Sequence, residues 1–371
     1  MALVVWAIDP QRVRRGQLVA LPGTAAVLRD ADVGTFTVPV PARDALSRRM
    51  GPGWRVAIQD DDQTVLSGPL TEVSESVADS TRTLTGVSDL IHVQDRTLFG
   101  DPSKVWTQQT AEGKYARSGP AETVIRDIVH ANVGTGAVTA RRQDGFTVAS
   151  SQGRGKSVKV NDRDKKVLEV IRPLARSGGV TFDAVQEQDS RIVFRFRVPV
   201  DRSRAVRFTA QNGGLTEGSY SLVAPSVNVA LAAGQGTGTY LNRREYVRAT
   251  SWGRRVEEYL DQTSTDDDPE IKQAADELLD EGREGATASI TAQEVKGCRY
   301  GTDFWLGDTV TVAFDSATVS EPVRQVELTW DGHGRTAVLS LGDHDSADDR
   351  TPKWVKKIKK LDARVRGMEV R

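Results

Sequence analysis

Two glycine-rich segments of this 371-residue chain contain residue types that can bind phosphate groups. Gly153-Arg-Gly-Lys-Ser157 resembles the end of a phosphate-binding loop, in which backbone amides and a lysine hold the phosphates. That loop needs a glycine five residues before Gly155, where Ser150 stands, and a buried strand in front of it. In Gly234-Gln-Gly-Thr-Gly238, the third glycine of the dinucleotide fingerprint is replaced by Thr239. Both departures weigh against nucleotide binding and favour glycine-rich loops or strands in which backbones approach closely.

Possible metal ligands are few and scattered along the chain. The four histidines are His92, His130, His333 and His344. None belongs to a His-Glu-x-x-His run or pairs with a cysteine at zinc spacing. Asp343-His344-Asp345 has residue types suited to a metal site or a hydrolase, but its polar surroundings favour a solvated linker. Asp60-Asp61-Asp62 is interpreted as a hairpin tip, because hard cations take six or more oxygens and no second ligand cluster is near.

Nucleophiles give no stronger case for catalysis. Cys298, the single cysteine, lies between Gly297 and Arg299, and the sequence links no base to it. A small buried side chain is therefore the favoured interpretation, with a nucleophile as the alternative. No serine lies in a Gly-x-Ser-x-Gly elbow, and no spacing singles out a pair among the 51 acidic residues. The sequence therefore predicts no enzyme, and no catalytic, cofactor-binding or metal-binding residues.

The composition is typical of a soluble chain with two or three domains. Hydrophobic residues make up 38%, and the formal net charge of -1 gives no overall attraction to nucleic acid or anionic membranes. A single cysteine excludes an internal disulfide framework and fits synthesis in a reducing cytoplasm. The N-terminal run Met1 to Asp9 has no basic leader and no long apolar region, so we expect no signal peptide and no stable membrane insertion.

The elements that must position these residues are mostly strands. Trp54, Val56 and Ile58 alternate with polar residues before the turn at residues 60–63, which predicts a hairpin. Alternation also predicts strands at residues 192–198, 308–314, 323–330 and 336–341. On the strand at 192–198, Arg195 and Arg197 are expected to face solvent, with a polyanion as the alternative.

Three helices are predicted inside the chain. Helical spacing predicts one from Pro120 to before Gly134 and one from about residue 164 to Gly178, which Pro173 should kink or shorten. Asp268-Pro-Glu begins a third helix, near 268–282. The resulting regions are β structure at 1–100, an α+β insert at 101–205, β structure with an inserted helix at 206–345, and a linker with a terminal helix at 346–371. The two β regions suggest a duplicated barrel.

The last twenty residues have the most distinctive pattern. Large apolar residues recur 4, 3, 4 and 3 apart, at Trp354, Ile358, Leu361, Val365 and Met368. This stripe, here named the C-terminal seam, is typical of a helix buried against a like helix, so it predicts an interface between copies. A terminal amphipathic helix on its own domain is the alternative, because the pattern is shorter than three heptads. From Arg350 on, nine Lys/Arg stand against Asp362 and Glu369, so the rest of the chain is acidic.

Several segments, in this order, resemble minor tail proteins of long-tailed bacteriophages of actinobacteria. They are residues 51–58 (GPGWRVAI), 66–70 (LSGPL), 83–91 (TLTGVSDLI), 170–182 (VIRPLARSGGVTF), 232–238 (AAGQGTG) and 306–312 (LGDTVTV). Such proteins are similar to the tail-tip or baseplate hub proteins of tailed phages. The resemblance covers the chain up to about residue 345. It implies a mainly β fold with two tail-tube-like β-barrel domains, an inserted α+β region and a C-terminal coiled-coil helix.

The resemblance also implies a function and partners. Three copies would form a ring at the tail tip that caps the tube, holds the end of the tape-measure protein and later passes DNA. Expected partners are two further copies, a distal tail or tail-tube protein, the tape-measure protein, and other tail-tip or fibre proteins, with genomic DNA only in transit. The protein would be part of the virion and be assembled in the host cytoplasm.

Two other functions remain open at this point. Relatives of such hubs carry cell-wall hydrolases, so a tail-associated hydrolase is the second hypothesis. The seven tryptophans motivate a third, a carbohydrate-binding tail module. Trp54 and Trp330 lie in strand patterns, however, and are better interpreted as core residues.

Overall fold

A computed structural model describes residues 3–342, except 62, 111–112, 188–189, 264, 293–294 and 333. The protein is mainly β, with 43% of residues in strands and 16% in helices, which confirms the predicted class. The chain divides into two compact units. Among the described residues, unit 1 comprises residues 3–218 and 289–340, and unit 2 comprises residues 219–288 with 341–342. The predicted boundaries at 100, 205 and 345 stay a prediction, and each unit is described by itself below.

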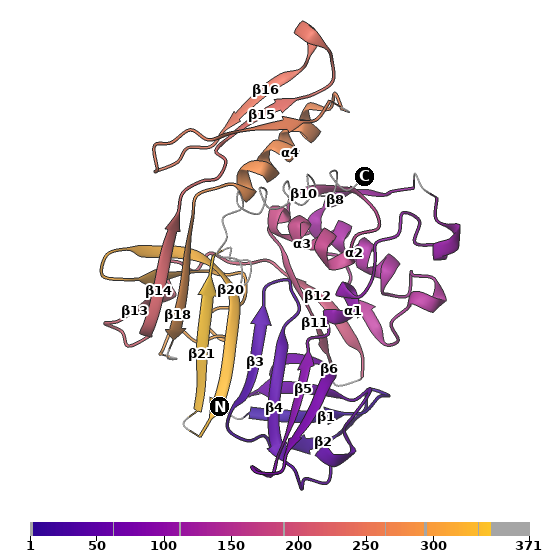
Figure 1. Ribbon diagram of the computed structural model, residues 1–371, viewed down its shortest axis with the longest axis vertical. Helices are drawn as coiled ribbons and strands as arrows, with labels where there is room; N and C mark the ends of the chain where they lie inside the picture. The colour runs from indigo at the N-terminus through magenta and orange to yellow at the C-terminus, as the bar shows by residue number, and fades with distance from the viewer. Residues whose placement is uncertain are drawn as a thin grey trace, which may run out of the picture. The chain divides into compact units, whose positions relative to one another are not determined.

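The N-terminal part of unit 1 is an antiparallel set of seven strands (Figure 1). They are β1 (Leu3–Ile8), β2 (Arg14–Leu18), β3 (Thr24–Arg29), β4 (Thr35–Pro41), β5 (Arg55–Asp60), β6 (Gln63–Ser76) and β7 (Thr81–Val87). β4 shows the alternation that builds the core, since Phe36, Val38 and Val40 are buried while their neighbours are half-buried. The predicted hairpin is confirmed as β5 and β6, and Asp61 turns there with a φ of 50°.

The middle of unit 1 mixes helices and strands. Its elements are α1 (Ile91–Gln94), β8 (Tyr115–Pro120), α2 (Ala121–Asn132), β9 (Phe146–Val148), β10 (Ser157–Asp162), α3 (Val167–Gly178), β11 (Thr181–Gln186) and β12 (Ile192–Arg197). The apolar faces of α2 and α3 pack in one core with Phe182 and Phe194 of the sheet β11-β12-β9. Pro173 does not end α3, which continues to Gly178 and is capped by Gly179 in the left-handed conformation.

The last strands of the chain join the first ones in a single sheet. They are β13 (Arg207–Thr209), β14 (Leu215–Val223), β18 (Gly285–Ala292), β19 (Thr309–Ala313), β20 (Thr318–Asp331) and β21 (Gly334–Leu341). β20 is long enough to pair with β19 through its first half and with β3 through Gln325–Trp330. Among the described residues the two predicted barrel regions therefore share one 13-stranded sheet, which corrects the expectation of two separate barrels.

Unit 2 is a small α/β arrangement. The strand order is β16 (Arg243–Val247), β15 (Val229–Ala233), β17 (Glu257–Asp261), and α4 (Asp268–Glu281) packs on one face of this sheet. Its core includes the buried residues Val227, Ala230, Ala275 and Leu279. α4 confirms the helix predicted near 268–282, with Pro269 in its first turn and Gly282 at its end.

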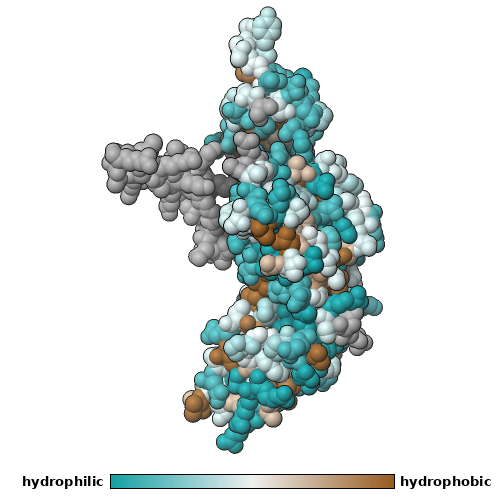
Figure 2. All heavy atoms as spheres, turned by 90° about the vertical axis from the view of Figure 1, so that its right-hand side faces the viewer, coloured by the Kyte–Doolittle hydropathy of each residue, from teal (hydrophilic) through white to brown (hydrophobic). Residues whose placement is uncertain are grey.

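Short 3-10 helices lie at Ser47–Arg49, Trp106–Gln108, Thr139–Arg141 and Gly238–Tyr240. Within the described part of the chain, no helix is both long and apolar enough to cross a membrane. On the face shown in Figure 2, hydrophobic residues form small groups within a mostly hydrophilic surface. The C-terminal seam, the predicted coiled coil, Asp343-His344-Asp345 and His333 all lie outside the described residues.

Candidate functional site

The first polar cluster of unit 1 surrounds Asp89. This residue follows β7 in the chain, and its side chain is completely buried. Its carboxylate accepts hydrogen bonds from Arg55 Nη2 on β5 and, at 2.6 Å, from Ser67 Oγ on β6. His92 Nε2 lies 3.6 Å from the same carboxylate. Burial alone would raise the pKa of Asp89, but Arg55, His92 and Ser67 outweigh burial and hold that pKa below its ordinary value.

A serine, a histidine and an aspartate in contact invite comparison with a catalytic triad. In a triad the serine hydroxyl gives its proton to the histidine, which the aspartate orients. Here Ser67 Oγ donates to Asp89 instead, and both side chains are fully buried. Ser67 Oγ also accepts a 2.6 Å hydrogen bond from the backbone amide of Gln186 on β11, and Gln186 Oε1 accepts one from Arg55 Nε. The geometry therefore fastens β5, β6 and β11 together.

Two further buried aspartates make similar connections. The Asp308 carboxylate accepts four hydrogen bonds of 2.7–3.1 Å, from Arg197 Nη1, Arg202 Nε and the amides of Val200 and Trp305. These bonds link the end of β12 and the residues that follow it to the segment just before β19. Asp30, at the end of β3, accepts hydrogen bonds from Thr181 Oγ1 of β11 and Arg324 Nη1 of β20, each at 2.5 Å.

Arg197 lies on the face of β12 away from the core, as predicted, but its guanidinium is paired with Asp308 and is only partly exposed to solvent. Arg195 lies on the exposed face, as expected, but is paired with Asp183. Both arginines alternate with apolar residues in the sequence. That pattern predicts on which face of the strand they lie, but it does not show which acidic residue lies next to each.

The segment predicted not to bind phosphate has a structural contact of its own. Gly153 to Lys156 leads into strand β10, whereas a phosphate loop leads into a helix. Arg154 instead donates to both carboxylate oxygens of the buried Glu122 in the first turn of α2, at 2.8 and 3.0 Å. These hydrogen bonds are the largest cause that lowers the pKa of Glu122.

Other candidate groups also have ordinary structural contacts. Cys298 is buried, its sulfur lies 3.4 Å from the carbonyl oxygen of Arg207, and burial raises the pKa of its thiol. Asp60, in the predicted hairpin tip, pairs with Arg335. Across the described residues, no three His, Cys, Asp or Glu side chains are grouped so as to hold a metal ion.

Unit 2 contains a different kind of surface, on the side of its sheet away from α4. The register places Leu231, Glu245 and Tyr259 side by side on this side, with Val229, Val247 and Glu257 in the next row. We name this side the open sheet face. Val247 and Tyr259 are each 61% exposed.

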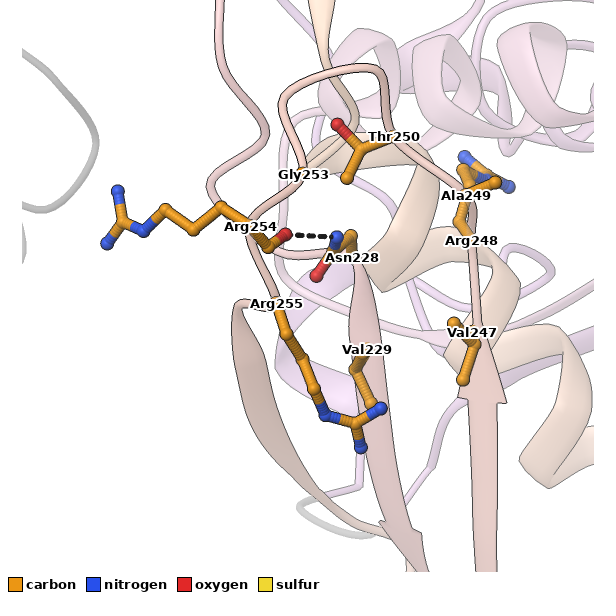
Figure 3. A pocket seen from close by; sticks show the side chains of 9 residues that line it. All are labelled: Asn228, Val229, Val247, Arg248, Ala249, Thr250, Gly253, Arg254 and Arg255. Atoms are coloured by element: carbon orange, nitrogen blue, oxygen red, sulfur yellow. Dashed lines mark hydrogen bonds between the residues drawn. The ribbon is translucent and has the colours of Figure 1, made fainter.

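One end of the open sheet face is hollowed (Figure 3). The hollow, about 250 Å³, is lined by Asn228, Val229 and Val247, and by residues 248–250 and 253–255 of the loop that follows β16. Arg255 lies across Val229 and donates to Glu245 at 3.1 Å and Glu257 at 2.6 Å, which joins the two outer strands. Arg254 points away from the hollow, while its carbonyl oxygen accepts a hydrogen bond from Asn228. The mixture of apolar and charged groups suits contact with another protein segment.

Sequence reasoning missed both kinds of site, although one signal was available. Arg55, Ser67, Asp89 and Asp308 each lie within a segment that carries the family resemblance. A polar residue at a buried position of such a segment needs a partner. The open sheet face had no such signal, because it depends on which strands become neighbours.

Comparison with known proteins matches residues 3–343 of the chain to the family described as Siphovirus ReqiPepy6 Gp37-like protein. No curated protein matches. Among solved structures, the 43 kDa tail protein of prophage MuSo2 from Shewanella oneidensis is similar, with a TM-score of 0.58 and 12% identity, over 92% of this chain and 97% of that one.

Two further tail proteins are similar in fold. Prophage tail protein gp18 from Listeria monocytogenes EGD-e has a TM-score of 0.57 and 11% identity, over 96% of this chain and 99% of that one. The tail protein from Neisseria meningitidis MC58 has a TM-score of 0.55 and 13% identity, over 92% and 97% of the two chains. At these identities the likeness concerns the fold.

Proposed function

Since the chain belongs to the family of Siphovirus ReqiPepy6 Gp37-like proteins, we propose that it is the hub of a siphophage tail tip. The protein is a structural component of a phage tail or baseplate. The more specific assignment is that three copies form a ring that caps the tail tube, holds the end of the tape-measure protein and forms part of the DNA ejection conduit.

The observation that carries this proposal is the extent of the likeness. The family matches residues 3–343, and the solved tail proteins resemble the chain over 92–96% of its length. A match confined to one region would leave room for a separate enzymatic domain, whereas this one takes in both units.

The internal contacts of unit 1 suit a ring component that carries load. Buried charge pairs around Asp30, Asp89 and Asp308 connect its early strands, its α+β part and its late strands. Such pairs are costly to break singly, since each loss leaves a charge buried without its partner. These contacts therefore connect the three parts of unit 1 with one another.

The proposed partners follow from the proposed position. Further copies of the chain would lie beside it, with a distal tail or tail-tube protein above, the tape-measure protein inside, and other tip or fibre proteins below. The C-terminal seam is the proposed contact among the three copies. DNA would pass through without stable binding, which suits a chain that is acidic outside its last residues, because neutralising phosphates would hold the DNA.

The test is electron microscopy of single particles of the purified protein, combined with its native mass. Threefold rings with a central hole and a trimeric mass are expected. Particles without a hole that stay monomeric at every concentration, and also when the tail-tube protein is added, would contradict the trimeric hub. Release of fragments from purified cell wall would instead favour the tail-associated hydrolase.

A further inference from the structure

Unit 2 carries an unusual share of the exposed apolar side chains. Of the thirteen large hydrophobic residues that are exposed in the described part of the chain, six lie in residues 219–288: Leu222, Val223, Tyr240, Val247, Trp252 and Tyr259. Val247 and Tyr259 lie on the open sheet face, on the two strands that flank Leu231. Water contact with these side chains is unfavourable by about 25 cal/mol per Å², so a covering segment gains free energy by burying them.

Charge narrows the kind of segment that can cover this face. Residues 219–288 contain thirteen Asp/Glu and seven Lys/Arg. On the open sheet face itself, Arg255 engages Glu245 and Glu257, and Thr263 donates two hydrogen bonds to Asp261. Arg243 lies in the same row as Asp261 and donates to the carbonyl oxygen of Gly238. A covering segment that is apolar on one side and basic on its flanks would therefore match both the exposed apolar side chains and the negative charge of unit 2.

The chain itself supplies a segment of this kind. The described residues end at Gly342, the residue after β21. Residues 343–371 follow, and their seam residues are flanked by Lys356, Lys357, Lys359, Lys360, Arg364 and Arg366. As a helix the seam would be about 21 Å long, from 1.5 Å per residue. The connection through residues 343–353 can reach about 35 Å when extended.

We propose that, in the free chain, the C-terminal seam docks on the open sheet face of its own unit 2. Val247, Tyr259 and Leu231 are covered by the seam, and the lysines beside the seam face Glu245, Glu257 and Asp261. The same apolar stripe cannot be buried on unit 2 and between copies at once. Docking therefore prevents the seam from binding other copies until assembly displaces it from the open sheet face. The docking stands without the hub assignment, and only this competition with self-association rests on the proposed function.

Zero-length carbodiimide cross-linking of the full chain tests the docking directly. An equal mixture of chains with natural nitrogen and with ¹⁵N separates links within one chain from links between chains. Expected are links from Lys356, Lys357, Lys359 or Lys360 to Glu245, Glu257 or Asp261, all within single chains. Links found only between chains, or only to carboxylates elsewhere, would overturn the proposal.

Hydrogen exchange of residues 352–371 in dilute full-length protein gives a second test. Val247→Asp and Tyr259→Asp should each raise the exchange rate at least tenfold, because a charge is placed where the seam packs. Val77→Asp is the matched control, since Val77 is 89% exposed in the turn between β6 and β7 of unit 1. Equal exchange in the wild type and in the two face variants would overturn the docking.

The two proposals fail in different ways. Intrachain links together with an absence of rings on a tail tube would leave the docking in place and remove the hub. Rings that form on a tail tube, together with fast hydrogen exchange of the seam in the dilute chain, would support the hub and remove the docking. If the competition holds, the two face variants should self-associate at lower concentration than the wild type.

Discussion

Single residues with buried charges hold the parts of unit 1 together. Asp308 illustrates this, since four donors from two separate stretches of chain converge on one fully buried carboxylate. A buried donor that loses its acceptor stays removed from water, so no hydrogen bond offsets the free energy lost on its desolvation. The structural role of such a residue is therefore large compared with that of an exposed pair of the same chemistry.

Asp308→Ala should destabilise unit 1 by roughly 3–5 kcal/mol, because it leaves two arginines and two backbone amides without their acceptor. Asp183→Ala is the matched control, since it breaks the pair with Arg195, in which both side chains are about half exposed. That loss should be about 0.2–1 kcal/mol. Urea unfolding followed by circular dichroism measures both, and similar losses for the two variants would contradict the role assigned to Asp308.

Asp89 makes the free energy of unfolding of unit 1 depend on pH, with lower stability at acidic pH. The pKa of Asp89 in the folded chain lies below its ordinary value of 3.8, so the unfolded chain takes up the proton first as the pH falls. The stabilisation is complete above about pH 4 and declines as the pH falls through the lowered pKa.

The variant Asp89→Asn should be less stable than the wild type at pH 7, and the difference should shrink as the pH falls below about 4. Unfolding free energies from urea titrations between pH 7 and pH 2 test this. A difference that stays constant over the whole range would show that the carboxylate charge has no part in the effect.

At the scale of elements, close contacts between backbones explain several glycines in the resemblance segments. Gly68 on β6 lies so near the end of β7 that an added Cβ would collide with the carbonyl oxygen of Val87. Gly86 on β7 has no side chain, and the ring of Phe36 occupies the space where a Cβ would lie. These glycines allow β6 and β7 to pack closely against the neighbouring chain, and larger side chains at these positions would separate them.

Gly68→Ala should therefore destabilise unit 1 by about 1–3 kcal/mol, since the obstructing atoms belong to the backbone and cannot rotate away. Gly51→Ala makes the same chemical change where no atom lies within 4 Å of the new Cβ, and should stay within about 0.5 kcal/mol of the wild type. Thermal melting of the two variants distinguishes them, and equal melting temperatures would refute the packing argument.

Elements with a strong local pattern were predictable, and contacts between distant elements were not. The spacing of Ile271, Ala275 and Leu279 was enough to predict α4, and the alternation of Ile192, Phe194 and Phe196 was enough for β12. The pairing of β20 with β3 joins residues about 300 positions apart, and no local pattern encodes that register.

The candidate sites were less predictable than the elements, for the same reason. Among 51 acidic and 50 basic residues, the sequence alone does not indicate that Asp308 meets Arg197 and Arg202. The C-terminal seam is the opposite case, since its spacing is local and distinct while its environment lies outside the described residues.

At the scale of the whole molecule, charge is separated along the chain. The last residues from Arg350 on are basic, with nine Lys/Arg, while residues 219–288 are acidic. Electrostatic attraction between these parts acts within one chain and also between copies, and it weakens with salt. Assembly therefore depends on which apolar surface the seam finally buries, and the seam residues are the place to test it.

Ile358→Asp combined with Leu361→Asp should weaken trimer formation by at least a hundredfold in dissociation constant and leave both units folded. Two charges within the buried stripe of each helix would meet the same charges of the neighbouring copies, and burying them unpaired costs several kcal/mol. Lys356→Ala combined with Lys359→Ala is the matched control, because it changes the net charge equally at positions outside the seam. Analytical ultracentrifugation measures the association, and circular dichroism checks the fold. An unchanged trimer in the seam variant would mean that copies associate through unit 1 or unit 2, and the ring would then have to form without its C-terminal helices.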